Sequence, residues 1–115
     1  MATDPNCIFC KIVAGQIPAK KIYEDADLIA IRDINPAAPT HILVVPRKHI
    51  ARLTDCAEAD AALLGRLQFA AGRIAAQEKL DSFRTVCNCG EGAGQSVWHI
   101  HLHLLGGRTL GWPPG

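Results

Sequence analysis

Seven residues near the end of the chain constrain its fold and chemistry more than any other stretch. The segment His99-Ile100-His101-Leu102-His103-Leu104-Leu105 alternates polar and apolar side chains, and Gly106-Gly107 follows it directly. A period of two predicts a β-strand whose apolar side chains face a core, while the three imidazoles line up on the opposite, solvated face. A row of titratable rings adds no packing and usually marks a functional site. We therefore expect the chemistry of this protein to lie in the histidine row.

The loop before the histidines is rich in glycine and in neutral hydrogen-bond donors. Glycines let backbone N–H groups turn toward a ligand, and short polar side chains add further donors, which suits a phosphate group. The residues concerned are Gly90, Gly92 and Gly94 together with Asn88, Gln95 and Ser96. The loop is not a dinucleotide fingerprint, because no strand–loop–helix unit accompanies it. Taken alone it could be a simple turn; next to the histidine row it predicts a phosphate held beside a nucleophile.

Length and composition favour an ordinary globular protein. A chain of 115 residues has room for one core, so we expect a single domain over residues 1–115. The formal net charge of +1 and the lack of a long apolar run argue against nucleic acid or a membrane as a partner. Five cysteines are an odd number and do not have the spacing of a secreted disulfide framework. With no signal-peptide pattern at the start, we expect the protein to be cytoplasmic.

The remaining pattern predicts an α+β fold. Apolar, β-branched runs indicate strands at 21–24, 28–33, 41–46 and 82–87, in addition to the histidine strand. A short helical segment is expected at 7–13, and a long amphipathic helix from about 55 to about 79. Asp55 and Glu58 fit a capping box at the start of the long helix. Because short turns join most successive strands, the sheet should be largely antiparallel, with the long helix covering it.

These residues resemble the histidine triad (HIT) superfamily in its nucleotide-binding Hint branch, which contains purine nucleoside phosphoramidase-like proteins. The histidine row is the full His-x-His-x-His-x-x signature of that superfamily. Other matches occur in the same order along almost the whole chain. They are Ile8-Phe9, Ile17-Pro18-Ala19-Lys20, Asp33-Ile34, Pro39-Thr40-His41, Pro46-Arg47-Lys48-His49-Ile50, Gly94-Gln95-Ser96-Val97, Gly106-Gly107 and Trp112-Pro113-Pro114-Gly115.

The resemblance implies a HIT-like five-stranded antiparallel sheet with one long and one short helix. It further implies a homodimer in which two sheets join into one continuous ten-stranded sheet. The implied activity is hydrolysis of adenosine phosphoramidates and related purine nucleoside phosphoramidates, which releases an amine and the nucleoside monophosphate. No cofactor is required for that chemistry.

The resemblance also implies the roles of individual residues. His101 matches the nucleophile, which attacks the α-phosphorus to form a nucleotidyl-histidine that water then cleaves. The catalytic group comprises His101, His103, His99, His41 and Ser96. The nucleotide-binding group comprises Ile8, Phe9, Asp33, Ile34, Asn88, Gly94, Gln95, Ser96, Val97, His101, His103 and Trp112. Within it, Asp33 matches the carboxylate that holds the ribose hydroxyls, and Trp112 matches a C-terminal residue that reaches toward the site of the partner subunit.

A second constellation has the composition of a structural zinc site. Cys7 and Cys10 form a CxxC pair, and with His49 and His99 they provide two thiolates and two imidazoles. Some bacterial-type relatives resemble this arrangement, whereas other Hint proteins lack the paired cysteines. The alternative is that both thiols are small buried hydrophobic side chains on a short helix. The sequence leaves both interpretations open.

Three functions are compatible with the pattern. The leading hypothesis is the phosphoramidate hydrolase, because the histidine row is intact. The second is a non-catalytic nucleotide-binding or partner-regulating module on the same fold. The third is a metallohydrolase whose histidines hold a catalytic metal, against which stands the lack of a carboxylate nearby in sequence. The leaving group and the choice between adenine and guanine stay open.

Overall fold

The computed structural model describes residues 3–115, and its strands form one antiparallel sheet in the order β1-β2-β3-β5-β4. Met1 and Ala2, at the start where no signal peptide is expected, lie outside the described residues. None of the helices within the described range is long and apolar enough to cross a membrane. The α+β class and the element order are confirmed. The elements are α1 (Ile8–Val13), β1 (Lys21–Glu24), β2 (Leu28–Arg32), β3 (Thr40–Pro46), η1 (Leu53–Asp55), η2 (Glu58–Asp60), α2 (Ala61–Gln77), β4 (Phe83–Val86), η3 (Glu91–Ala93) and β5 (Leu102–Gly106).

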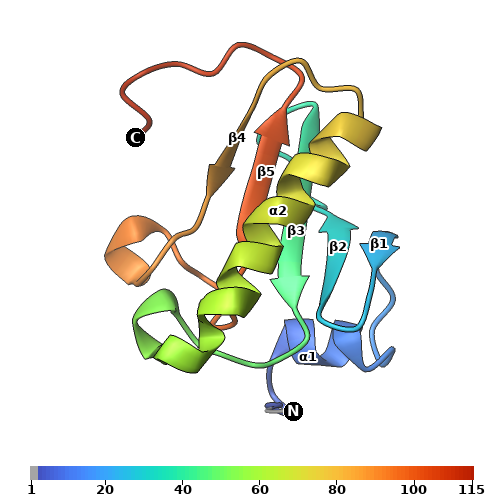
Figure 1. Ribbon diagram of the computed structural model, residues 1–115, viewed down its shortest axis with the longest axis vertical. Coiled ribbons are helices and arrows are strands. Elements are labelled where there is room, and N and C mark those ends of the chain that lie inside the picture. Colours follow the sequence, from blue (N-terminus) through green and yellow to red (C-terminus); the bar gives the residue numbers. More distant parts are fainter. Residues whose placement is uncertain (1–2) are drawn as a thin grey trace.

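The two faces of the sheet pack against different helices. Helix α2 runs diagonally across one face, whereas α1 lies near the end where β3 stops (Figure 1). Successive side chains of a strand point to opposite faces, so Leu28 and Ala30 of β2 pack in the core under α2, and Ile29 and Ile31 pack in the core that includes α1. Both faces of β2 are therefore buried, which explains why its sequence is a continuous apolar run.

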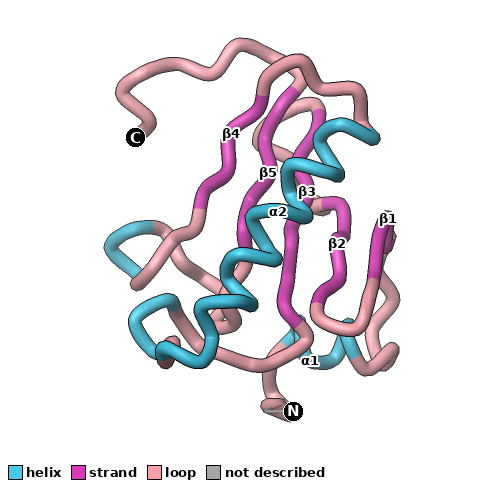
Figure 2. Tube along the Cα trace, viewed as in Figure 1, coloured by secondary structure: helices cyan, strands magenta, loops and turns pink. Residues whose placement is uncertain are grey.

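The long helix begins later than the sequence pattern predicts. Helix α2 starts at Ala61 and is preceded by the two short 3₁₀ turns η1 and η2, the second of which leads directly into it. Figure 2 shows helical residues in cyan before the long straight part of α2. The predicted capping box at Asp55 and Glu58 is wrong. Asp60 takes that place: its Oδ2 accepts the N–H of Ala57 at 2.8 Å, and its Oδ1 accepts from Lys48 Nζ at 2.6 Å.

The histidine strand is shorter than the alternation predicts. Strand β5 begins at Leu102, so His99 and His101 precede it. The chain bends at 97–99 and is anchored there by the Ile100 N–H, which donates to the Ile50 carbonyl at 2.8 Å. The expectation of a solvated histidine face is also wrong, because His99 is fully buried and His101 is 8% exposed.

Candidate functional site

His101 has the geometry of a nucleophile. Its Nδ1 lies 2.7 Å from the carbonyl oxygen of His99. A carbonyl only accepts, so Nδ1 carries the proton and Nε2 of the neutral ring keeps a free lone pair. Burial is the main cause that lowers the pKa of His101, which favours this neutral form. The ring of Phe9 packs edge-on against the imidazole, with 5.1 Å between the ring centroids.

His41 and His103 form a hydrogen-bonded pair on the neighbouring strands β3 and β5. The backbone N–H of Ala37 donates to Nδ1 of His41 at 2.9 Å, so neutral His41 carries its proton on Nε2. That Nε2 lies 2.9 Å from Nδ1 of His103 and 3.4 Å from Oδ2 of Asp33. His103 therefore accepts at Nδ1 and carries its own proton on Nε2. Desolvation by burial is the main cause that lowers the pKa of His103 to about 4, so this ring is neutral at pH 7.

The structure brings to this pair a carboxylate that is distant in sequence. Asp33, which directly follows β2, offers an oxygen that lies within 4.8 Å of ring nitrogens of both His41 and His103. Two imidazoles and a carboxylate are a common metal-ligand set. The lack of a carboxylate nearby in sequence therefore does not exclude a catalytic metal, because the fold brings Asp33 to the two histidines. The Ala37 N–H, however, keeps the Nε2 proton of His41 between the three groups. A metal there would need that proton to leave, and the geometry favours a hydrogen-bonded cluster instead.

Ala37, whose backbone contacts the histidine pair, was missed by the sequence analysis. It contributes a backbone N–H, which every residue except proline possesses, so no side-chain pattern predicts this contact. The proline-rich loop 35–39 carried the only signal, since such a loop holds its backbone in a restricted set of conformations.

The glycine-rich loop is fastened from inside by Gln95. Its amide nitrogen donates to the carbonyls of Ala51 and Val97 at 2.8 and 3.0 Å, and its Oε1 accepts the N–H of Gly90 at 2.9 Å. The side chain of Gln95 therefore holds the loop, and its predicted place in the nucleotide-binding group stays a prediction. Gly94 has a φ of +97°, a conformation for which glycine is favoured, and a Cβ there would lie 3.7 Å from Nδ2 of Asn88. The loop thus places Asn88 beside a bare backbone segment.

The other predicted nucleotide-binding residues fall into two groups. Phe9 is buried against the histidine rings, and Val97 packs against the core that includes α1. Ile34 and Trp112 are 92% and 82% exposed, so this single chain does not bury them. Two further residues belong to this surface group: Ile8 is about half exposed, and Ser96 is exposed in the glycine-rich loop.

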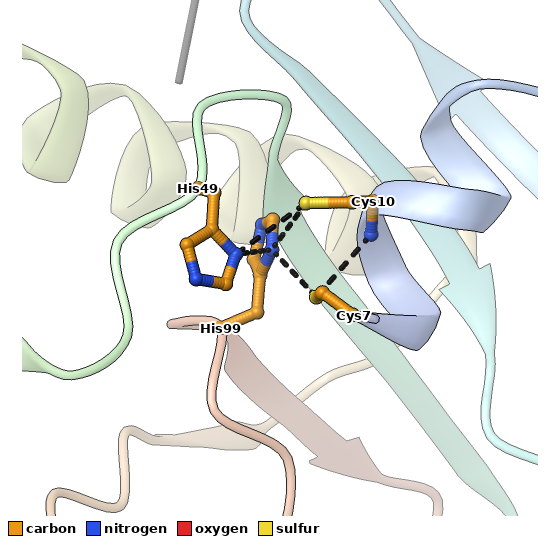
Figure 3. Close-up of side chains that lie close together, drawn as sticks. All are labelled: Cys7, Cys10, His49 and His99. Atoms are coloured by element: carbon orange, nitrogen blue, oxygen red, sulfur yellow. Dashed lines mark hydrogen bonds between the residues drawn. The ribbon is translucent and has the colours of Figure 1, made fainter. Parts of the chain in front are cut away.

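Cys7, Cys10, His49 and His99 converge on one point, as Figure 3 shows. Nδ1 of His99 lies 3.3 and 3.6 Å from the two sulfurs, and 3.2 Å from Nδ1 of His49. Cys10 Sγ lies 3.4 Å from Nδ1 of His49. His99 Nε2 donates to the Pro46 carbonyl at 2.7 Å, which leaves its Nδ1 lone pair directed into the cluster.

This donor set fits a zinc ion. Zn–S bonds of about 2.3 Å and Zn–N bonds of about 2.0–2.1 Å in a tetrahedron separate the ligand atoms by about 3.3–3.8 Å. Four of the six separations in the cluster are 3.2–3.6 Å, and all of the ligand atoms lie within 4.8 Å of one another. The sulfurs also accept backbone N–H groups, from Cys10 to Cys7 and from Asp4 to Cys10, each at 3.4 Å. Such N–H donors are the outer contacts that orient metal-bound thiolates.

Comparison with known proteins shows the family to which the chain belongs. A HIT family hydrolase from Legionella pneumophila superposes with a TM-score of 0.94 at 50% identity, over 96% of this chain and all of that chain. A Zn-bound histidine triad family protein from Mycobacterium smegmatis superposes with a TM-score of 0.80 at 38% identity, over 90% of this chain and 76% of that one. A 14 kDa zinc-binding protein from Zea mays is 47% identical over 97% of this chain and 90% of its own length. The family model that describes the HIT domain matches residues 14–110, and the chain belongs to this family.

Proposed function

We propose that this protein hydrolyses purine nucleoside phosphoramidates through a covalent intermediate on His101. The observation that carries the proposal is the hydrogen bond from His101 Nδ1 to the His99 carbonyl, because it leaves Nε2 as an unprotonated, buried nucleophile. A name shared by two similar solved structures, HIT family hydrolase, supports the reaction class.

The reaction proceeds in two displacements at phosphorus. In the first, His101 Nε2 forms a bond to the α-phosphorus while the P–N bond breaks, and the amine leaves with a proton. In the second, water attacks the same phosphorus and returns a proton to Nε2 of His103, the P–Nε2 bond to His101 breaks, and the nucleoside monophosphate is released. The proton on Nε2 of His103, whose Nδ1 faces His41, is available to the leaving amine.

Neutral donors and one carboxylate serve the nucleotide. Asn88, Ser96 and the backbone at Gly94 would donate to phosphoryl oxygens, where negative charge builds up during transfer. Asp33 would accept from the ribose hydroxyls. The base would lie against Ile8, Phe9 and Ile34, an apolar surface that accepts adenine or guanine. The P–N bond specificity and these contacts are supported by the resemblance to purine nucleoside phosphoramidases.

We also propose a structural zinc ion held by Cys7, Cys10, His49 and His99. When bound, it would cross-link the helix α1, the segment after β3 and the approach to β5. His99 belongs to that cluster through its ring and holds the nucleophile through its carbonyl. The chemistry itself needs only the side chains and backbone of the chain.

The proposed unit is a homodimer of single HIT domains (1–115), acting in the cytoplasm on purine nucleotides rather than nucleic acid or membranes. Strand β4 lies at the edge of the sheet, with its Phe83 side chain 42% exposed, so a second β4 could extend the sheet to ten strands. Trp112 would then contact the site of the partner. Light scattering at defined protein concentrations measures this assembly.

Turnover of an adenosine phosphoramidate carrying a fluorescent amine tests the proposed function. Wild type should release the amine rapidly, and the His101→Asn variant should be inactive while it keeps its fold and thermal unfolding midpoint. Rapid quenching followed by mass spectrometry should detect wild-type chain carrying one nucleotidyl group.

Equal rates in wild type and His101→Asn would refute the nucleophile. Tight nucleotide binding without release by either protein would favour the non-catalytic binding module. Loss of turnover on treatment with a chelator, in protein that stays folded, would favour a metallohydrolase.

A further inference from the structure

Gly107 brings the chain after β5 against the loop that carries Ala37. Its φ is +92°, and a Cβ at this position would lie 2.9 Å from Cβ of Pro39. Only glycine allows so close a passage with this backbone conformation. The next residue, Arg108, therefore lies beside loop 35–39.

The side chain of Arg108 binds a backbone carbonyl of that loop. Nη2 donates to the carbonyl of Ala37 at 2.9 Å, and Nη1 donates to the carbonyl of Thr109 at 3.1 Å. Within residues 3–115, Arg108 takes part in no salt bridge. The guanidinium group is planar and rigid. When it donates to two carbonyls, it fixes the direction of the peptide groups that contain them.

Ala37 is thus held on both of its backbone groups. Arg108 holds the carbonyl, and the N–H donates to Nδ1 of His41 at 2.9 Å. The near end of the loop is fixed separately, because the N–H of Asn35 donates to Oδ1 of Asp33 at 2.8 Å. Without the Arg108 contact, the Ala37 carbonyl loses its side-chain partner. The Ala37 N–H, which is joined to that carbonyl through the same Cα, is then held only by the His41 ring and can turn away from it more easily.

The direction of the Ala37 N–H decides which nitrogen of His41 carries the proton. While the N–H donates to Nδ1, the proton sits on Nε2 and points to His103 and Asp33. If the N–H turns away, Nδ1 can take the proton. Nε2 of His41 would then be an acceptor facing Nδ1 of His103, so that one of the two rings must change tautomer or lose the hydrogen bond.

We propose that Arg108 is a positioning residue that fixes the tautomer of His41 through the backbone of Ala37, and with it the proton on Nε2 of His103. The residue touches neither substrate nor the reacting atoms. The inference rests on the proposed function for its kinetic consequence, whereas the tautomer can be measured without substrate.

The test compares Arg108→Ala and Arg108→Lys with wild type in turnover and in ¹⁵N NMR of the histidine rings. In wild type, Nδ1 of His41 should have the chemical shift of an unprotonated nitrogen and Nε2 that of a protonated one. Arg108→Ala should shift both signals toward intermediate positions and lower kcat by about tenfold, with KM within about twofold. Arg108→Lys, which keeps one donor, should lie between them. Arg47→Ala is the matched control, because Arg47 also donates to a loop carbonyl, that of Asp25 at 2.7 Å, away from the histidines.

Three results would overturn the proposal. One is a wild-type His41 protonated at Nδ1; another is an Arg108→Ala variant with the wild-type nitrogen signals. The third is a changed tautomer with unchanged kcat. If wild type itself shows no turnover, the proposed function fails, and the nitrogen signals alone decide whether Arg108 sets the tautomer.

Discussion

Protonation of His99 should make the metal-free protein sensitive to acid. His99 is completely buried, and desolvation is the main cause that lowers its pKa to about 4, against 6.5 for the free side chain. Its charged form is therefore disfavoured in the folded state. The stabilisation is fully present above about pH 6.5, where the ring is neutral in both states, and it is lost as the pH falls toward 4. Each pKa unit corresponds to about 1.4 kcal/mol, so the free energy of unfolding should fall by about 2 kcal/mol at pH 5 and about 3 kcal/mol at pH 4.

Urea unfolding of chelator-treated protein at several pH values measures this loss. The His99→Gln variant removes the titration but keeps an amide that can donate to the Pro46 carbonyl, as His99 Nε2 does. The two proteins differ at this one side chain, so the difference between the two pH profiles reports His99 together with its charge coupling to His49 and His101. Parallel profiles between pH 7 and pH 4 would show that the burial of this ring has no such cost.

Two further predictions concern the metal cluster and the close packing at the end of β5. Purified wild type should contain about one zinc ion per chain, and Cys7→Ser should lose most of it, whereas Cys87→Ser, outside the cluster, should retain it; metal analysis that finds no zinc in wild type would contradict the site. Gly106→Ala should lower the free energy of unfolding by about 1–3 kcal/mol, because its Cβ would lie 2.7 Å from Cδ1 of Leu80. Gly111→Ala, where a Cβ meets nothing within 4 Å, should change it by less than about 0.5 kcal/mol in the same denaturant titration.

The strands were predictable where local pattern and sheet geometry agree. The range 21–24 is β1 without change, because its ends are set by turns that the sequence shows. The histidine strand was overpredicted at its start. Its alternation includes His99 and His101, but two contacts hold this segment out of the sheet. His99 lies in the cluster with Cys7, Cys10 and His49, and the Ile100 N–H donates to the Ile50 carbonyl. A tertiary contact thus overrides a local period.

Which site residues lie next to one another was harder to predict than which residues belong to the site. Sequence spacing alone does not place Asp33 beside His103, since the pairing of β2, β3 and β5 brings them together. The tautomers depend on backbone groups, such as the carbonyl of His99 and the N–H of Ala37. No side-chain pattern marks these groups, and their direction becomes visible only in a three-dimensional structure.

The division of the interior by the sheet has a consequence for how the protein opens. The core under α2 contains none of the four proposed zinc ligands, whereas the core that includes α1 contains two of them, Cys7 and Cys10. Local opening on the α1 side would therefore separate the cluster without exposing the α2 side. Amide hydrogen exchange in α1 should respond to zinc removal at low free energy, while amides of α2 report global unfolding. On this prediction, the sheet separates a part of the protein that opens when metal is removed from a part that opens only when the whole fold unfolds.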